Sequence, residues 1–230
     1  MPQVTLDPSQ LVGRCAHWSP ANSELPKNDG QKVGSLCDQT VAAALAEMLG
    51  GIPVCKPTSA RSLLPPQADC VEVGPTRIIG GIRPQNFDVV YRPDGVRFAY
   101  DSKTLNSRSS VGKNYQNMIN DLGTEAATVH TRFPSAIVAF VFAVPTACLG
   151  GHRQGLLGAL YRLGGRLATN ADLHKAEAIA IAAYDPVTGG IDLTFPPANM
   201  NKLRLENFSK QVEEAYMERF AGLPPHISPN

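Results

Sequence analysis

The sequence predicts an α/β protein with a central mixed β-sheet flanked by helices, and three observations lead to this fold class. Residues 31–49 are rich in alanine and leucine and carry an apolar stripe at helical spacing. Residues 87–91 and 96–100 are β-branched and aromatic runs on either side of a turn sequence. Residues 136–144, within a strand predicted at 135–144, form an unbroken apolar run, as in a strand that is buried on both faces.

The chain begins with a polar stretch that we expect to form an irregular N-terminal arm. Residues 1–30 are rich in proline, asparagine and aspartate, and we expect a single domain over 31–230 to follow them. The helix predicted at 31–49 ends at a pair of glycines, which favour the backbone conformation of a helix end. Residues 52–70 hold four prolines and are predicted to form a surface excursion before a glycine-interrupted strand at 71–82.

The two β-branched runs predict a β-hairpin. The RPDG sequence between them has proline at the second turn position and a glycine that accepts a positive φ. A two- or four-residue loop would pair Tyr91 with Val96 and, in the same register, Asp88 with Ala99. A bulge at the turn would change this register.

The rest of the chain alternates between helical and strand-like patterns. The predicted elements are a helix at 111–130, the buried strand at 135–144, a glycine-interrupted helix at 152–168, a helix-to-strand segment ending at Tyr184, a strand at 191–195 and an amphipathic helix at 205–220.

The composition excludes several classes of protein. The 230 residues are 43% hydrophobic and 18% charged, which allows a sizeable core and is too apolar for a disordered chain. The net charge of +1 leaves any nucleic-acid surface to a local patch. No secretory signal and no run of the roughly 20 apolar residues of a membrane helix is evident, so we expect no membrane partner. Five scattered cysteines without a CxxC pair argue against zinc and disulfides and favour a cytoplasmic protein.

Three charged side chains are predicted to converge on one face of the hairpin. Side chains alternate along a strand, so Asp101 and Lys103 point the same way, and the hairpin register brings Asp88 to that face. Two carboxylates and a lysine suit a Mg²⁺ site, because this ion binds carboxylates together with substrate phosphate. The metal would polarise the phosphate, and the lysine would position the attacking water. The alternative is an exposed ion pair between Asp101 and Lys103 on an edge strand.

The order of elements and the motif together resemble the PD-(D/E)XK nuclease superfamily, which has the restriction-endonuclease-like αβββαβ core. Asp88 matches the first acid of the family, and Asp101-Ser102-Lys103 matches its (D/E)-x-K element. The resemblance covers residues 31–145, and it departs from the family pattern at Phe87, where many members have proline. It implies magnesium-dependent hydrolysis of DNA phosphodiesters that leaves 5′-phosphate and 3′-hydroxyl ends.

The resemblance also implies further site residues. In many relatives an acid from the first helix reaches the metal, which points to Glu47 as a third metal ligand, with Asp38 as a second candidate. An exposed charge near the helix end is the alternative for Glu47. Glu72, on the first strand, is another candidate ligand. In some relatives a glutamine on the helix after the D-x-K strand organises the site and touches phosphate, and Gln116 resembles that residue.

A DNA-binding surface is expected on two segments. Lys113 and Asn114 open the helix after the D-x-K strand, where backbone amides favour an anion. Arg153, Arg162 and Arg166 form the most basic stretch, and the last two would share a helix face by their spacing of four. Ordinary solvated helix faces are the alternative for both segments.

A stand-alone chain of this size resembles a type II restriction endonuclease. This implies double-stranded DNA as the partner, a homodimer, and a role in DNA recognition and dimerisation for residues 146–230. The alternatives are a DNA-repair or recombination nuclease of the same fold and a non-catalytic DNA-binding module.

Overall fold

The structure, a computed structural model, describes residues 1–224, leaving out the side chains of residues 110, 112–114 and 152. Within this part of the chain, helices and strands alternate as an α/β fold. The helices are α1 (Pro8–Arg14), α2 (Lys27–Met48), α3 (Arg108–Arg132), α4 (Arg153–Leu163) and α5 (Leu205–Phe220), with 3₁₀ turns η1 (Thr146–Cys148), η2 (Gly150–His152) and η3 (Ala198–Leu203). The strands are β1 (Val54–Cys55), β2 (Val71–Ile79), β3 (Pro84–Tyr91), β4 (Phe98–Thr104), β5 (Ile137–Pro145) and β6 (Ala178–Tyr184).

The six strands form one mixed sheet in the order β1-β2-β3-β4-β5-β6. β2, β3 and β4 form an antiparallel meander, whereas β4, β5 and β6 run parallel to one another. α3 makes the crossover between the parallel neighbours β4 and β5. The prediction of a mixed sheet flanked by helices is therefore confirmed.

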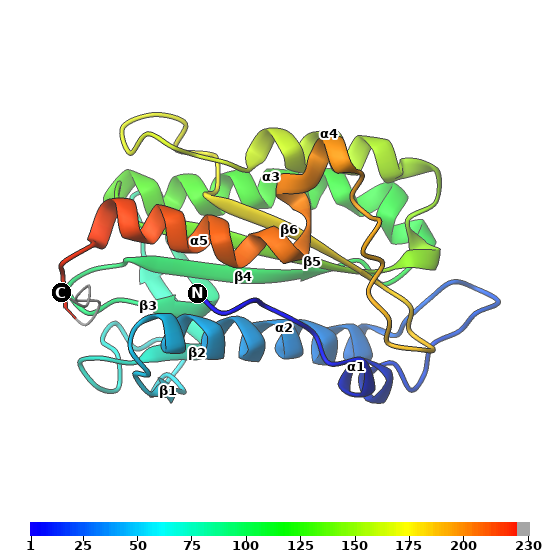
Figure 1. The fold of residues 1–230 in the computed structure, drawn as a ribbon, viewed down its shortest axis with the longest axis horizontal. Helices are drawn as coiled ribbons and strands as arrows, with labels where there is room; N and C mark the ends of the chain where they lie inside the picture. Colours follow the sequence, from blue (N-terminus) through cyan, green and yellow to red (C-terminus); the bar gives the residue numbers. More distant parts are fainter. Residues whose placement is uncertain (225–230) are drawn as a thin grey trace.

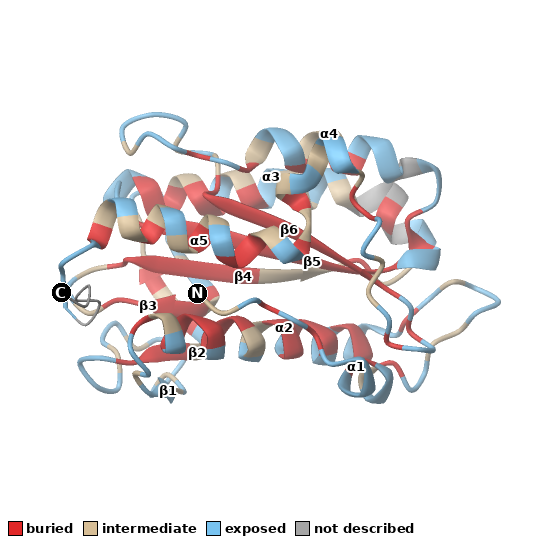
Figure 2. Ribbon diagram, viewed as in Figure 1, coloured by how far each residue is buried: buried red, intermediate tan, exposed pale blue. Residues whose placement is uncertain are grey.

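Helices cover both faces of the sheet (Figure 1). α2 and α5 pack on one face, where Val41 and Leu45 meet the same core cluster as Phe208 and Val212. α3 and α4 cover the other face in a second cluster. Figure 2 shows the strands between these layers as the most buried part of the molecule. Every residue of β5 and of β6 is buried, as expected for strands that are covered on both faces.

The prediction that residues 1–30 form an irregular N-terminal arm is wrong, because the segment contains helix α1. Asp7 accepts a hydrogen bond from Gln10 N at 2.9 Å and caps α1, and Pro8 occupies the first turn, where it is tolerated. Val4 and Leu11 belong to the core on the α2 face. The segment is therefore part of the domain, and α2 begins four residues before the predicted helix start, at Lys27.

Two predictions fail in the last third of the chain. Residues 191–195 form no strand, because Asp192 Oδ1 accepts hydrogen bonds from both the backbone N–H and the hydroxyl of Thr194 and so makes a turn. The helix predicted to reach residue 168 ends at Leu163. Gly165 follows with a φ of 83°, a conformation that glycine adopts most readily.

The hairpin register differs from the predicted one by two residues. Tyr91 pairs with Phe98, and Val90 pairs with Ala99. The loop is longer than predicted, and Arg97 N closes it by donating to Tyr91 O at 3.0 Å. A shift of two keeps every side chain of a strand on its predicted face, so the expected proximity of the charged residues survives.

Among the described residues, no helix combines the length and the apolar character that crossing a bilayer requires.

Candidate active site

The candidate site lies where β3 and β4 separate. The pairing of β3 with β4 stops at Val89 and Tyr100, while β4 continues along β5 as far as Thr104. The backbone of β4 beyond Tyr100 therefore lacks a strand partner on its β3 side. The carboxylate of Asp88 fills this place, since Asp88 Oδ2 accepts a hydrogen bond from Ser102 N at 3.2 Å.

Asp101 and Lys103 point from β4 toward α3. Lys103 Nζ makes an ion pair with Asp101 and a second one, of 3.0 Å, with Glu125 Oε1 from α3. Glu125 Oε1 also accepts a hydrogen bond from Gln85 Nε2 at 3.2 Å. The carboxyl groups of Asp88 and Asp101 lie near enough to interact, and this interaction acts to raise the pKa of Asp101. The predicted set of Asp88, Asp101 and Lys103 is thus brought together by the structure.

On the opposite face of β4, α2 contributes Asp38. The carboxyl group of Asp38 interacts with the Ser102 side chain, and the charge of Asp88 acts on Asp38. Gly34, one turn earlier, lies so close to the strand that a Cβ there would be 3.0 Å from Ser102 Oγ. Gly30, one further turn back, approaches the Asn106 side chain even more closely. The Gly30–Gly34–Asp38 stripe, at i, i+4 and i+8, sets α2 against β4 and so places Asp38.

Asp38, Asp88, Asp101, Lys103 and Glu125 are called the acid–lysine cluster below. It holds four carboxyl groups and one ammonium, and the electrostatics reflect this imbalance. Burial, followed by the charge of Asp88, raises the pKa of Asp38 to about 8. Burial, followed by the interaction with Asp88, holds the pKa of Asp101 well above its ordinary value. The cluster therefore has a deficit of positive charge when its carboxyl groups are ionised.

The donor set fits a hard divalent cation. Asp38 Oδ1 and Glu125 Oε2 are buried without a hydrogen-bond partner in the described part of the chain, and carboxylate oxygens are the ligands that Mg²⁺ prefers. No three His, Cys, Asp or Glu side chains of the described residues form a ready-made metal cage. Asp38, Asp88 and Asp101 would be the ligands of a bound metal.

A hollow of about 290 Å³ adjoins the end of β4 next to the cluster. Thr104, which follows Lys103, lines it together with Lys27 from α2 and Met118 from α3. A larger hollow of about 450 Å³ lies at the turn end of the hairpin and is lined by residues 92–96. That hollow takes no residue from the acid–lysine cluster.

The structure does not bring Glu47, Gln116 or Glu72 into the cluster. Glu47 is exposed and lies nine residues after Asp38, about 180° around the same helix. Gln116 is exposed and lies nine residues before Glu125, on the other side of α3 by the same reasoning. Glu72 is buried in an ion pair of 2.6 Å with Arg92. Asp38 and Glu125 are the acids that the two helices contribute, and the glycines at Gly30 and Gly34 are the sequence signal that could have identified Asp38.

The predicted DNA-contact residues divide into three groups. Arg166 is 2% exposed and pairs with Glu177 at 2.9 Å, so its assignment to a DNA surface is wrong; it also lies beyond the end of α4. Arg153 and Arg162 are exposed, and Arg153 lies 4.1 Å from the ring centroid of Phe195. Lys113 and Asn114 are also predicted to contact DNA, but their side chains lie outside the described part of the structure.

Comparisons with known proteins give no match to a family model, to a curated protein or to a solved structure.

Proposed function

We propose that this protein is a magnesium-dependent nuclease that hydrolyses phosphodiester bonds of double-stranded DNA, in the manner of a type II restriction endonuclease. The observation that carries the proposal is the acid–lysine cluster at the divergence of β3 and β4, with Asp88, Asp101 and Lys103 in mutual or shared contact. The order of α2, the β2–β3–β4 meander, α3 and β5 matches the order of the core in the nuclease superfamily that the sequence resembles.

A structural role alone explains the cluster poorly. Burying several carboxyl groups around one ammonium destabilises a fold, and apolar residues of similar volume would pack as well or better. Perturbed pKa values at convergent acids are typical of functional sites. The raised pKa values of Asp38 and Asp101 therefore favour a site that is completed by a bound cation.

Each residue of the acid–lysine cluster has a definite part in the proposed reaction. Asp38, Asp88 and Asp101 would hold Mg²⁺, which supplies polarisation of the scissile phosphate and a lower pKa for a bound water. Lys103 would orient the attacking water and offset negative charge on the phosphate. Glu125 keeps Lys103 in place through a second ion pair when Asp101 engages a cation.

The test is cleavage of supercoiled plasmid by the purified protein with magnesium. Discrete fragments would indicate a restriction enzyme, progressive degradation an end-dependent repair nuclease, and binding without cutting a non-catalytic module. We expect Asp101→Asn and Lys103→Arg each to lower the cleavage rate by a factor of at least about 100, because each removes a group aligned on the reacting phosphate.

Lys210→Arg is the matched control for Lys103→Arg, since Lys210 is an exposed lysine on α5, far from the acid–lysine cluster in sequence. Thermal unfolding followed by circular dichroism checks that each variant is folded. Undiminished cutting by a folded Asp101→Asn or Lys103→Arg protein would contradict the assignment of the site.

A further inference from the structure

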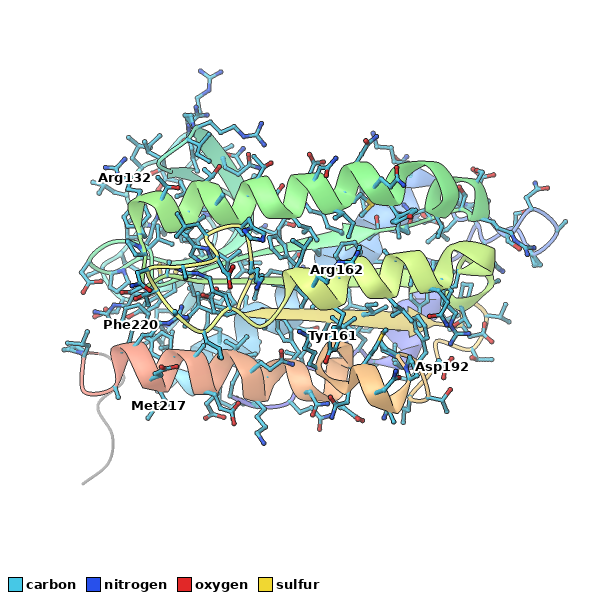
Figure 3. All side chains as sticks on the ribbon, turned by 90° about the horizontal axis from the view of Figure 1, so that it is seen from above. Arg132, Tyr161, Arg162, Asp192, Met217 and Phe220 are labelled. Atoms are coloured by element: carbon cyan, nitrogen blue, oxygen red, sulfur yellow. The ribbon has the colours of Figure 1, made fainter. Side chains whose placement is uncertain are left out.

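A hollow lined by basic side chains lies between α3, α4 and η3. Its volume is about 670 Å³, and Arg162, His174, Lys175 and Lys202 line it; we call it the basic hollow. Figure 3 shows Arg162, with Tyr161 beside it, at the C-terminal end of α4 on the surface between α3 and α5. None of its lining residues belongs to the acid–lysine cluster.

The basic hollow has more positive charge than its acidic neighbours neutralise. Lys175 pairs with Asp172 at 2.8 Å. Lys202 Nζ instead donates to Gly164 O at 3.1 Å and lies 3.9 Å from the ring centroid of Tyr161. Burial and then the charge of Lys175 lower the pKa of Lys202. Within the described residues, no carboxylate forms an ion pair with Arg162, His174 or Lys202, so an anion would relieve the repulsion in this hollow.

The basic hollow and the acid–lysine cluster lie on opposite flanks of α3. Ile119 lines the hollow, and a Cβ at Gly123 would lie 3.8 Å from His174 O. Glu125, only two residues later, is about 200° further around the helix and pairs with Lys103. The two sites are therefore separated by at least the diameter of a helix, on the order of 10–12 Å.

The face of α3 between these flanks is exposed and carries amide side chains. Gln116, Asn117 and Asn120 are all exposed, and by helical periodicity they lie on the side away from the sheet. Their side chains make no hydrogen bond with other described residues. In a helix interior, asparagine is less favourable than alanine by roughly half a kcal/mol or more of helix stability. The stability of α3 therefore does not explain these asparagines.

We propose that α3 lies in the major groove of duplex DNA, with a phosphate of one strand at the acid–lysine cluster and a phosphate of the opposite strand in the basic hollow. This inference rests on the proposed nuclease function and adds how the substrate is held. The major groove, about 12 Å wide, admits an α-helix and is bordered by the two backbones. Asparagine and glutamine side chains on such a helix can form paired hydrogen bonds with adenine.

The first test measures binding of a short random-sequence DNA duplex as a function of salt, with calcium in place of magnesium. The plot of log K against log salt concentration has a negative slope. Arg162→Gln and Lys202→Gln should each reduce the magnitude of this slope by about 1 and weaken binding to all sequences alike. Lys210→Gln, at an exposed lysine of α5, is the matched control and should leave the slope unchanged.

The second test addresses the amide face. Asn117→Ala and Asn120→Ala should leave the salt slope intact but weaken binding to the preferred sequence, found by selection from a random duplex pool, by a factor of about 5 to 100. Both variants should be at least as heat-stable as the original protein, because alanine favours the helix. A loss of affinity can then not be ascribed to misfolding.

The outcomes separate the two proposals. Hollow variants with unchanged affinity and slope, in a protein whose cleavage still requires Asp101, would overturn the placement of DNA and leave the nuclease function intact. An unchanged sequence preference after substitution of Asn117 and Asn120 would also overturn it. A protein that neither binds nor cuts duplex DNA would end both proposals.

Discussion

Asp38 illustrates how a single side chain at the candidate site works against the stability of the fold. Its Oδ1 atom is buried without a hydrogen-bond partner in the described part of the chain, and its carboxyl lies near the like charge of Asp88. A buried carboxylate in this position destabilises the folded state. Such a residue is expected where a bound cation restores the balance of charge.

We therefore expect Asp38→Asn to stabilise the metal-free protein at pH 7 to 8 by about 1–2 kcal/mol and to raise its melting temperature by several degrees. The same change should lower the cleavage rate in magnesium, because one proposed metal ligand is lost. Thermal unfolding with a chelator and a plasmid cleavage assay measure the two effects.

Glu47→Gln is the matched control, because Glu47 is an exposed acid on the opposite side of the same helix. It should alter neither stability nor cleavage. A lower melting temperature for Asp38→Asn would show that Asp38 is held by favourable contacts, contrary to this interpretation.

The sequence was sufficient to predict Asp88, Asp101 and Lys103 as neighbours, because alternation along a strand depends only on residue number. The hairpin register was wrong by two residues, and the face was still right because the alternation has a period of two. The acids from the helices were not predictable in this way. Which side of a helix meets the sheet depends on tertiary packing, so the sequence alone does not select Asp38 over Glu47.

At the level of elements, α2 is positioned by its glycines. Gly30 and Gly34 face β4 and the loop after it, and the Asn106 side chain occupies the space that a Cβ at Gly30 would need. Alanine normally favours a helix interior over glycine. At Gly30 the close approach reverses this preference, because the half-buried Asn106 amide, which donates to Thr104 Oγ1, would have to move.

Gly30→Ala should therefore destabilise the protein by about 1–3 kcal/mol, since overpacking forces the helix away from β4. It should also reduce cleavage by displacing Asp38. Gly13→Ala in α1 is the control, because a Cβ there meets nothing within 4 Å. That substitution should stabilise the protein slightly, by about 0.5–1 kcal/mol. Urea unfolding distinguishes the two, and equal effects of both substitutions would contradict the role of the close approach.

Most elements could be predicted from periodicity, and the failures have local causes. α5 covers Leu205–Phe220, as the amphipathic pattern predicts. The strand predicted at 191–195 was lost to a side-chain turn at Asp192, which competes with sheet pairing. α1 begins at the capping signal Asp7-Pro8, but the polar composition of the segment favours an irregular arm, so composition alone does not predict this helix.

On the scale of the whole molecule, a buried charge network joins distant parts of the chain. Glu177, which directly precedes β6, pairs with Arg166 at 2.9 Å and with Arg219 of α5 at 2.7 Å. Its other oxygen lies 3.2 Å from His130 Nε2 of α3 and accepts from Val138 N. Arg166, which belongs to the basic stretch predicted to face DNA, is thus buried in the interior. Composition alone does not predict which basic residue of that stretch is buried.

This network should make stability depend on acid pH. Burial acts to raise the pKa of Glu177, but His130 and Arg219 outweigh it, so that the pKa is lowered from its ordinary value of 4.5. The stabilisation is therefore complete above about pH 4.5 and is lost as the pH falls through the lower pKa of the folded state.

Glu177→Gln should destabilise the protein by about 3–5 kcal/mol at pH 7, because it leaves two buried guanidinium groups without their charge partner. The difference from the original protein should shrink as the pH falls below 4.5. Urea unfolding at both pH values measures this, and Glu206→Gln, at an exposed ion pair, is the control. A constant difference across the pH range would contradict the network as the cause.

The two borders of the sheet limit how copies of this protein can associate. On one border, β1 pairs only with Val71 and Glu72 of β2, and Pro75 and a bulge between Val73 and Thr76 interrupt the rest of that edge. On the other border, β6 is buried along its whole length, with isolated bridges from Arg204 and Ile191 lying along it. Neither border therefore offers a long unbroken row of open backbone groups to another chain. A homodimer, if it forms, must use helix or loop surfaces rather than a continuous sheet across two subunits, and the same protected borders guard the native protein against stacking into fibrils.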